Sequence, residues 1–147
     1  MNMNKKISKN FILKEMCGAR EDNIPKKEHL IDAMYLVNSV LQPLRNKYGR
    51  IVVTSFYRNL DYNRSVGSSD RSQHTKGQAV DIQFKDYDIE KAFLEIKHDN
   101  IIEFDQLIYE DSGNAKWLHI SKKTEKNRNQ ILVAKKIDNK MIYREVL

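Results

Sequence analysis

The sequence contains a single cysteine, Cys17, among its 147 residues. An intrachain disulfide and a cluster of thiolate zinc ligands are both excluded, because each needs at least two cysteines. The position of Cys17 beside Met16 indicates a small buried residue rather than a reactive nucleophile. The fold must therefore depend on an apolar core and not on covalent cross-links.

Long apolar runs are also missing. No stretch approaches the ~20 apolar residues that a membrane-spanning helix needs. The N-terminal segment MNMNKKISKNFILKEM is basic, but its apolar part is too short and too interrupted for a signal peptide. We therefore expect no signal peptide and no membrane partner, and a location in the cytoplasm unless something else releases the chain.

Glycine and proline are scarce, with five and two residues, whereas 40% of the chain is hydrophobic and 31% is charged. This composition is typical of globular proteins. The length suits one domain with a single core, and no repeat, linker or low-complexity segment interrupts it. We therefore predict a single domain over residues 1–147.

Lysine and arginine outnumber the acids, which gives a formal net charge of +6. This excess favours polyanionic partners such as nucleic acid, anionic cell-wall polymers or carboxylate-rich peptides. No alternation of basic and aromatic residues and no nucleic-acid-binding motif is present, so we predict no nucleic-acid partner. The one basic cluster is interpreted as solvated surface: Lys122, Lys123, Lys126 and Arg128.

A long helix is predicted over residues 26–49. Its apolar residues recur every three or four positions, as on one face of a helix, at Leu30, Met34, Val37, Leu41 and Leu44. Pro43 is expected to kink this helix or to end its regular part, and Gly49 to stop it. A second helix is predicted over residues 86–99, with Ile89, Ala92, Phe93 and Ile96 on one face.

Strands are predicted where β-branched and aromatic residues gather between turn-forming segments, at residues 50–58, 79–84, 104–110 and 117–121. Residues 130–146 are predicted to form a C-terminal hairpin that turns at Asp138 and Asn139. Residues 59–72 are expected to be a loop. The order predicts an α+β fold, a mainly antiparallel sheet with helices packed on one side.

The strand AVDIQF contains an acid that its pattern does not explain. Val80, Ile82 and Phe84 share one face of this strand and Asp81 lies on the other, where an isolated buried charge would be very costly. His74 is a candidate to share a partner with Asp81. Because seven extended residues would span roughly 23 Å, the two can meet only if the chain reverses between them, and Gly77 permits such a reversal.

His119 lies in WLHIS, on the opposite face from Leu118 and Ile120. Spacing alone leaves two interpretations open, a metal ligand and a hydrogen-bonded core histidine. A catalytic zinc ion typically takes three protein ligands and leaves a position for water. His29 and His98, which complete the histidines of the chain, lie in helical and charged contexts and are expected to be exposed.

These residues resemble the signature of the zinc D-alanyl-D-alanine carboxypeptidases, peptidase family M15, whose fold is shared with the hedgehog signalling domain. The signature SxHxxGxAxD, followed much later by WxH, is present as Ser72, His74, Gly77, Ala79, Asp81, Trp117 and His119. The resemblance extends to KNFILKEM, LQPLR and FDQLIYE, and covers a core of roughly residues 8–125. The upstream segment TSFYRNLDYNRSVGSSDRSQH also resembles the family's SGYRxxxxNxxxGG stretch, with two departures: Phe56 replaces a small residue and Ser68 replaces the second glycine.

The resemblance implies one zinc ion held by His74, Asp81 and His119. Such an ion lowers the pKa of a bound water to around 7, which supplies hydroxide at neutral pH. It would also explain Asp81, because a metal ion neutralises the buried acid.

A zinc peptidase also needs a general base. Many family members carry an acid three residues before the last histidine, where this chain has Lys116. Hedgehog-like relatives place a glutamate at the end of the preceding strand, and this resemblance points to Glu110. Asp105 and Asp111 are the alternatives.

The resemblance further implies a substrate-binding or carbonyl-polarising role for Arg58, whose guanidinium matches a carboxylate bidentately. The alternative for Arg58 is a surface ion pair with Asp61 or Asp70. Ser72 is expected to add a hydrogen bond to substrate, and Trp117 to be a cleft wall or a core anchor. Asn63 and Tyr57 are expected to fix the loop.

Two functions from different classes follow. The first is a zinc peptidase that cuts peptidoglycan stem peptides at bonds involving D-amino acids, either as an endopeptidase such as one acting between L-alanine and D-glutamate, or as a D-alanyl-D-alanine carboxypeptidase. Small proteins of this family are typical of bacteriophages, so we expect an endolysin or a virion-associated enzyme that meets other virion components. The alternative is a catalytically inactive zinc-containing binding or structural module, which Lys116 favours.

Overall fold

The computed structural model describes residues 1–146, and its centre is a six-stranded sheet of order β3-β4-β6-β5-β7-β8. All neighbouring strands are antiparallel except β5 and β7, which run parallel. A small two-stranded sheet near the N-terminus is formed by β1 (Lys6–Ser8) and β2 (Phe11–Ile12). The strands of the large sheet are β3 (Ile51–Ser55), β4 (Ala79–Phe84), β5 (Gln106–Asp111), β6 (Lys116–Ser121), β7 (Gln130–Ile137) and β8 (Lys140–Glu145).

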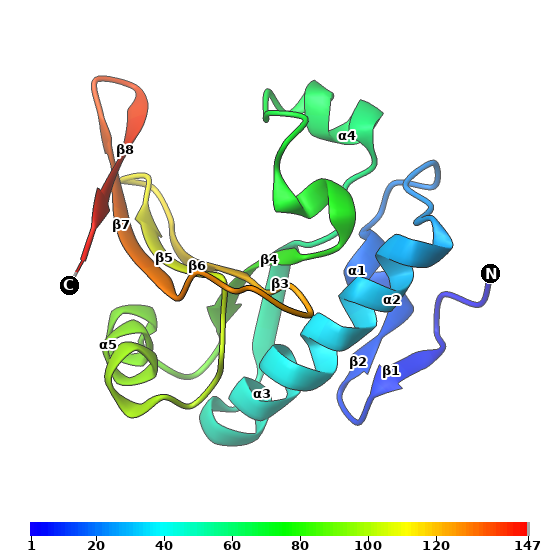
Figure 1. The fold of residues 1–147 in the computed structure, drawn as a ribbon, viewed down its shortest axis with the longest axis horizontal. Helices are drawn as coiled ribbons and strands as arrows, with labels where there is room; N and C mark the ends of the chain where they lie inside the picture. The colour runs from blue at the N-terminus through cyan, green and yellow to red at the C-terminus, as the bar shows by residue number, and fades with distance from the viewer. Residues whose placement is uncertain (147) are drawn as a thin grey trace.

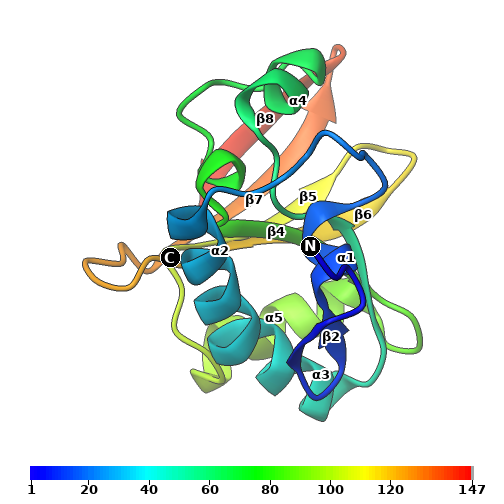
Figure 2. The same cartoon turned by 90° about the vertical axis from the view of Figure 1, so that its right-hand side faces the viewer.

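Most helices cover one face of this sheet, below it in Figures 1 and 2. They are α1 (Leu13–Cys17), α2 (Lys27–Leu36), the π-helical turn η1 (Val37–Leu41), α3 (Gln42–Tyr48) and α5 (Ile89–Asp99). On the opposite side lie α4 (Leu60–Ser65) and the 3-10 helix η2 (Gln73–Lys76). The predicted α+β class is confirmed, and α4 and η2 are the helical segments that leave the helical layer.

The long predicted helix is present as the continuous succession α2, η1 and α3, and it stops at Gly49, whose φ is +85°. The predicted face is wrong at Met34, which is 40% exposed while the neighbouring Ala33 is buried, whereas Leu30 packs against the core as predicted. A π-helical turn adds one residue to the helix, so the positions before η1 are rotated relative to those after it. Pro43 is the second residue of α3, after Gln42, and so lies in the first turn that follows η1.

The core lies between the sheet and the helical layer. Val80 and Ile82 are fully buried there, with Phe84 at the end of the same strand. Helix α5 contributes Ala92, Phe93 and Ile96, as its periodicity predicts, and Cys17 is buried in the same cluster. The alternation of AVDIQF therefore places Asp81 on the face of the sheet that the long helix and α5 do not cover.

Two predictions for the connecting segments have different outcomes. The C-terminal hairpin turns at Asp138 and Asn139, with φ values of +50° and +64°, as predicted. The predicted loop over residues 59–72 instead contains α4, whose N-cap is the Asn59 side chain accepting a hydrogen bond of 2.8 Å from the Tyr62 amide. An asparagine at such a position is a helix-start signal.

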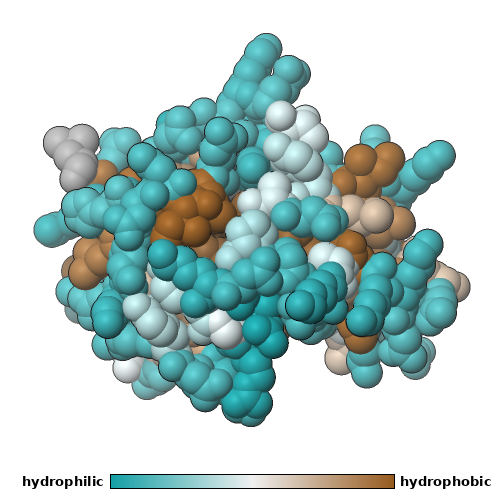
Figure 3. All heavy atoms as spheres, turned by 90° about the horizontal axis from the view of Figure 1, so that it is seen from below, coloured by the Kyte–Doolittle hydropathy of each residue, from teal (hydrophilic) through white to brown (hydrophobic). Residues whose placement is uncertain are grey.

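The outer surface of the helical layer is mostly hydrophilic. Figure 3, seen from below Figure 1, shows this surface with separate apolar groups and no single apolar belt. Leu94 on α5 is one of the exposed apolar side chains, at 47% exposure. None of the helices in residues 1–146 has the length and apolar character that crossing a membrane requires.

Candidate metal centre

Three neighbouring strands bring the first site residues together. Asp81 on β4 is the register partner of His119 on β6, and His119 is in turn the partner of Ile108 on β5. Side chains of directly opposite residues point to the same face, with their Cβ atoms about 5 Å apart. Two ligand candidates separated by 38 residues in the sequence thus become neighbours.

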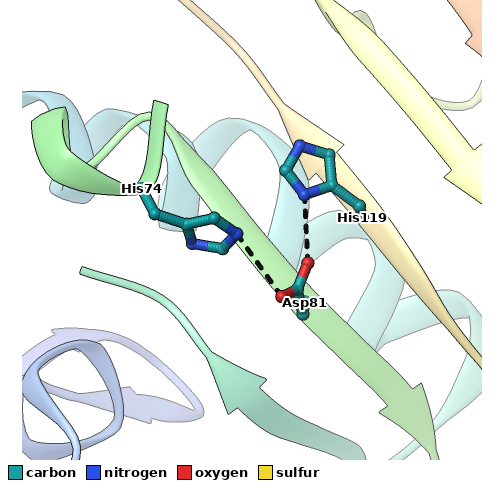
Figure 4. A group of neighbouring side chains, drawn as sticks. All are labelled: His74, Asp81 and His119. Atoms are coloured by element: carbon teal, nitrogen blue, oxygen red, sulfur yellow. Dashed lines mark hydrogen bonds and ion pairs between the residues drawn. The ribbon is translucent and has the colours of Figure 1, made fainter. Parts of the chain in front are cut away.

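His74 reaches the same point from η2, which immediately precedes β4. Gly77 ends η2 in the left-handed conformation, with φ of +72°, and this turns the chain back toward β4. The start of η2 is capped by Ser72, whose hydroxyl accepts a hydrogen bond from the His74 amide at 3.3 Å. The reversal expected at Gly77 is therefore present, and His74 and Asp81 face each other (Figure 4).

The geometry of the three side chains fits a metal ion. His119 Nδ1 lies 3.0 Å from Asp81 Oδ1, and His74 Nε2 lies 3.4 Å from Asp81 Oδ2. All three ligand atoms lie within 4.8 Å of one another. In a tetrahedral zinc site with bonds of ~2.0 Å, neighbouring ligand atoms are about 3.3 Å apart. Two imidazole nitrogens and one carboxylate oxygen are a zinc donor set that leaves one coordination position open.

A backbone carbonyl fixes the tautomer of His74. Nδ1 lies 2.6 Å from the carbonyl oxygen of Phe56, and a carbonyl only accepts, so Nδ1 carries the proton. The unprotonated Nε2 then faces Asp81 with a free lone pair. A hydrogen bond of this kind is the usual outer-shell support of a histidine ligand.

Burial shifts the pKa values of the three residues in different ways. Burial lowers the pKa of His74, which keeps the imidazole neutral as a metal ligand must be. Burial alone would raise the pKa of Asp81, but hydrogen bonds from His119 and His74 outweigh it and hold this pKa well below its usual value. The pKa of His119 is raised, since its hydrogen bond to Asp81 outweighs its burial.

Glu110 lies on β5, directly opposite Trp117 on β6. It is 8% exposed, and burial raises the pKa of its carboxyl, with the negative charge of Asp81 adding to the effect. The hydroxyl of Tyr143 donates a hydrogen bond to Glu110 Oε1 at 3.1 Å. Glu110 is therefore a buried acid on the same face as Asp81 and His119, and not a solvated turn residue.

Arg58 follows β3 and is held by three neighbours. Its Nε donates to Ser55 Oγ at 3.0 Å, its Nη1 donates to Asn63 Oδ1 at 3.1 Å, and its Nη2 lies 3.7 Å from Asp81 Oδ2. The predicted alternative, a surface pair with Asp61 or Asp70, is not formed within residues 1–146: Asp70 pairs with Arg64, and the carboxylate near Arg58 is that of Asp81. A guanidinium has five N–H donors, so Arg58 retains donors for a ligand.

Every predicted site residue lines one open cleft of about 570 Å³. Its walls come from the segment between α4 and η2 and from the β7–β8 hairpin, and its floor from β4, β6 and β5. Its lining consists of Arg58, Ser68, Arg71, Ser72, Gln73, His74, Asp81, Gln106, Ile108, Glu110, Trp117, His119, Arg128, Leu132 and Tyr143. Trp117 and Ser72 are both among these lining residues.

The alternative acids lie elsewhere. Asp111 and Lys116 are register partners at the ends of β5 and β6, and strand alternation directs them away from the face that carries Glu110 and His119. Asp105 is completely buried, where it accepts hydrogen bonds from Arg128 and from Gln73. None of these three lines the cleft, so Glu110 is the acid beside the candidate metal site.

Two surface predictions need correction. The basic cluster is not simply solvated, because Lys122 is buried over the ring of Tyr35 and Lys123 lies 3.7 Å from Asp105. His29 is half-buried and not exposed, with its Nδ1 3.3 Å from the hydroxyl of Tyr57. In both cases a long-range partner covers a side chain that its local sequence context describes as polar.

Tyr143 is one of the cleft residues that sequence reasoning missed, and it contacts the predicted base. It lies on β8, 33 residues after the carboxylate that it contacts. Its local context, KMIYRE, predicts only a strand with alternating side chains. No signal in the sequence indicates that this strand stands beside Glu110, because the parallel pairing of β5 with β7 decides it.

Comparison with known proteins agrees with this arrangement. Residues 9–121, more than half of the chain, match the family described as Peptidase M15. No curated protein sequence matches the chain. The matched residues include the candidate metal ligands and Glu110, whereas β7 and β8 lie beyond them. On the extent of this match, and with a candidate metal centre in its expected place, the chain belongs to the peptidase M15 family.

Proposed function

We propose that the protein is a zinc metallopeptidase that hydrolyses peptidoglycan stem peptides at bonds involving D-amino acids. The observation that carries this proposal is the convergence of His74, Asp81 and His119 within 4.8 Å, in a cleft that also contains Glu110 and Arg58. Membership of the peptidase M15 family supports the same reaction class.

In this proposal His74 Nε2, His119 Nδ1 and one oxygen of Asp81 hold the zinc ion. When bound, zinc of this kind polarises a carbonyl and makes water acidic enough to act as a nucleophile at neutral pH. The Phe56 carbonyl orients His74 for this role through the 2.6 Å hydrogen bond to Nδ1.

Glu110 is proposed as the general base. Its carboxyl lies beside the candidate metal centre in a largely buried position, and burial raises its pKa toward the range in which a base both accepts and returns protons readily. Glu110 would take the proton of the attacking water and deliver it to the leaving amine. Lys116 does not line the cleft, so the departure from the usual family position leaves this assignment intact.

Arg58, Ser72 and Trp117 are proposed to hold the substrate. The donors of Arg58 that Ser55 and Asn63 leave free can bind a substrate carboxylate or polarise the scissile carbonyl. Arg71 and Arg128 add positive charge to the cleft lining. Peptidoglycan stem peptides carry several free carboxylates, and this chemistry matches a cleft with three arginines.

The proposed biological setting is phage-type cell-wall degradation, with the protein held in the cytoplasm until lysis or carried by the virion with other virion components. An endopeptidase, cutting for example between L-alanine and D-glutamate, suits this role because only internal cuts dissolve the wall. A D-alanyl-D-alanine carboxypeptidase would instead remove only a terminal residue. The net charge of +6 favours contact with anionic wall polymers.

The test is to incubate the zinc-loaded protein with purified peptidoglycan and to identify the released fragments by mass spectrometry. Wild-type protein should release peptides whose new termini name the cleaved bond, and His74→Ala and Glu110→Gln should release none. Thermal unfolding gives a second measurement, since zinc at about 100 times its Kd stabilises the folded state by about 2.7 kcal/mol. His74→Ala should lose this stabilisation.

The alternative is a catalytically inactive zinc-containing module of the same fold, which Lys116 at the usual acid position favours. Stoichiometric zinc in wild-type protein, together with no fragments from several wall types, would support this module and contradict the peptidase.

A further inference from the structure

The C-terminal hairpin forms one wall of the cleft although it lies beyond the residues matched to the peptidase family. Strand β7 pairs in parallel with β5, and β8 pairs with β7. Figure 1 shows the hairpin opposite α4, on the side of the sheet away from the long helix. Leu132 from β7 and Tyr143 from β8 line the cleft.

One row of residues crosses this part of the sheet. Trp117 on β6 is the partner of Glu110 on β5, Glu110 is the partner of Ala134 on β7, and Ala134 is the partner of Tyr143 on β8. Partners in register point to the same face. Glu110 therefore stands between an indole on one side and, across a single alanine, a phenol on the other.

Ala134 is what allows Tyr143 to contact Glu110. Adjacent strands are ~4.8 Å apart, so the backbones of β5 and β8 are separated by about 10 Å. Two long side chains can span this distance only if the residue between them is small. Ala134 is fully buried under them, and the Tyr143 hydroxyl reaches Glu110 Oε1 at 3.1 Å.

The contact has a direct consequence for Glu110. A hydroxyl that donates to Oε1 restrains the position of this oxygen and leaves Oε2 to exchange a proton. On the other side, the buried indole of Trp117 also faces Glu110 and lowers the pKa of this carboxyl, which burial raises.

We propose that Tyr143 is a positioning residue that holds the Glu110 carboxylate beside the His74–Asp81–His119 cluster, so that the β7–β8 hairpin is part of the active site. The catalytic consequence rests on the proposed function, in which Glu110 is the base. The contact itself does not depend on that function, and the two can be tested separately.

The first experiment measures the contact without activity. Urea unfolding midpoints of the zinc-loaded chain are compared for wild type, Tyr143→Phe, Glu110→Ala and the double variant. If Tyr143 holds Glu110, the midpoint shift caused by Tyr143→Phe in the wild type disappears in the Glu110→Ala background. Equal shifts in both backgrounds would overturn the proposal.

The second experiment measures the effect on hydrolysis of soluble peptidoglycan fragments prepared with a muramidase. Tyr143→Phe should lower kcat roughly 10-fold, which is part of the ~10²–10⁴-fold rate enhancement that a general base contributes. KM should change less than about twofold. A purely structural role in the cleft wall would change KM and the zinc content instead. Unchanged kcat would overturn the proposal.

Ile142→Ala is the matched control, because Ile142 precedes Tyr143 on β8, points to the other face and is 42% exposed. It should keep wild-type kcat and KM. If the wild-type protein releases nothing, the proposed function fails, and the unfolding cycle then decides by itself whether Tyr143 holds Glu110.

Discussion

The two faces of the large sheet are built from the same strands but have different roles: one packs against helices and the other lines the cleft. On the helix side, Val80 and Ile82 are fully buried among apolar side chains from the long helix and α5. On the cleft side, Asp81 lies between them in the sequence and meets His74 and His119. The helix side stabilises the fold through many interchangeable apolar contacts, whereas the cleft side depends on a few specific distances.

This difference predicts how substitutions behave. Apolar packing is spread over many atoms, so a change on the helix side should lower stability in proportion to the volume removed. The cleft side contributes little apolar burial, so a change there should alter metal binding or catalysis while the fold survives. The four variants below test this contrast.

The largest effect is expected for Asp81→Ala. It removes the carboxylate that links both histidines, so zinc affinity should fall by more than the 10–100-fold typical of losing an outer-shell partner, and hydrolysis should be lost with it. Zinc content after dialysis, measured by atomic absorption, checks this. The control is Gln83→Ala, two residues further on the same face of β4, which should keep its zinc. Full zinc retention by Asp81→Ala would contradict the ligand assignment.

On the helix side, Ile82→Ala should destabilise the protein by about 2–5 kcal/mol, because it removes most of a fully buried side chain and leaves a cavity. Urea unfolding provides the measurement. Val52→Ala on the edge strand β3, where Val52 is 43% exposed, should cost less than about 1 kcal/mol. Zinc content per folded molecule should stay unchanged in both, and a loss in Ile82→Ala would mean that the two faces are coupled.

Gly77 ends η2 on the cleft side and lies against α2 of the helical layer. Gly77→Ala should destabilise the protein by about 3 kcal/mol, at the upper end of the cost of backbone strain. Its φ is +72°, and a Cβ there would lie 2.5 Å from the backbone oxygen of His29 on α2. Gly113→Ala is the matched control, because φ is +86° there but the Cβ would meet open space. If thermal unfolding showed the same loss of stability for both variants, the close approach of His29 on α2 would not contribute to the cost of Gly77→Ala.

The smallest effect concerns Asp105, whose carboxylate accepts hydrogen bonds from Gln73 of η2 and from Arg128, which precedes β7. Burial alone would raise its pKa, but hydrogen bonds from Arg128 lower it from 3.8 to about 2. Because the folded-state pKa is the lower one, this stabilisation is fully present above pH 4 and is lost as the pH falls from about 4 to about 2. Its size is about 2 kcal/mol.

Urea unfolding between pH 5 and pH 2 tests this, and Asp105→Asn should show a smaller pH dependence than the wild type. Asp86→Asn, which changes an exposed ion pair with Arg50, is the control for replacing an acid outside this hydrogen-bond network. If Asp105→Asn showed the same pH dependence of urea unfolding as the wild type, the role assigned to Asp105 would be contradicted.

Much of the fold follows from short-range rules. The alternation of AVDIQF, the helix over residues 86–99 and the turn at Asp138 and Asn139 are all present as predicted. These features depend on side-chain periodicity and on backbone preferences that a few neighbouring residues decide. The segment Leu60–Ser65 and the rotated first half of the long helix escaped this reasoning. In the helix, one extra residue in a π-helical turn shifts every position before it.

The candidate site likewise has one part that the sequence predicts and another that it does not. The sequence by itself determined the candidate site residues, because His74, Asp81 and His119 stand in a recurrent motif and the strand period assigns Asp81 and His119 to a face. Only the tertiary structure decided that Asp105 is bound by Arg128 and that Tyr143 contacts Glu110 across Ala134. Those contacts depend on the order of strands in the sheet, and pairing between distant segments is a property of the whole fold that no local pattern encodes.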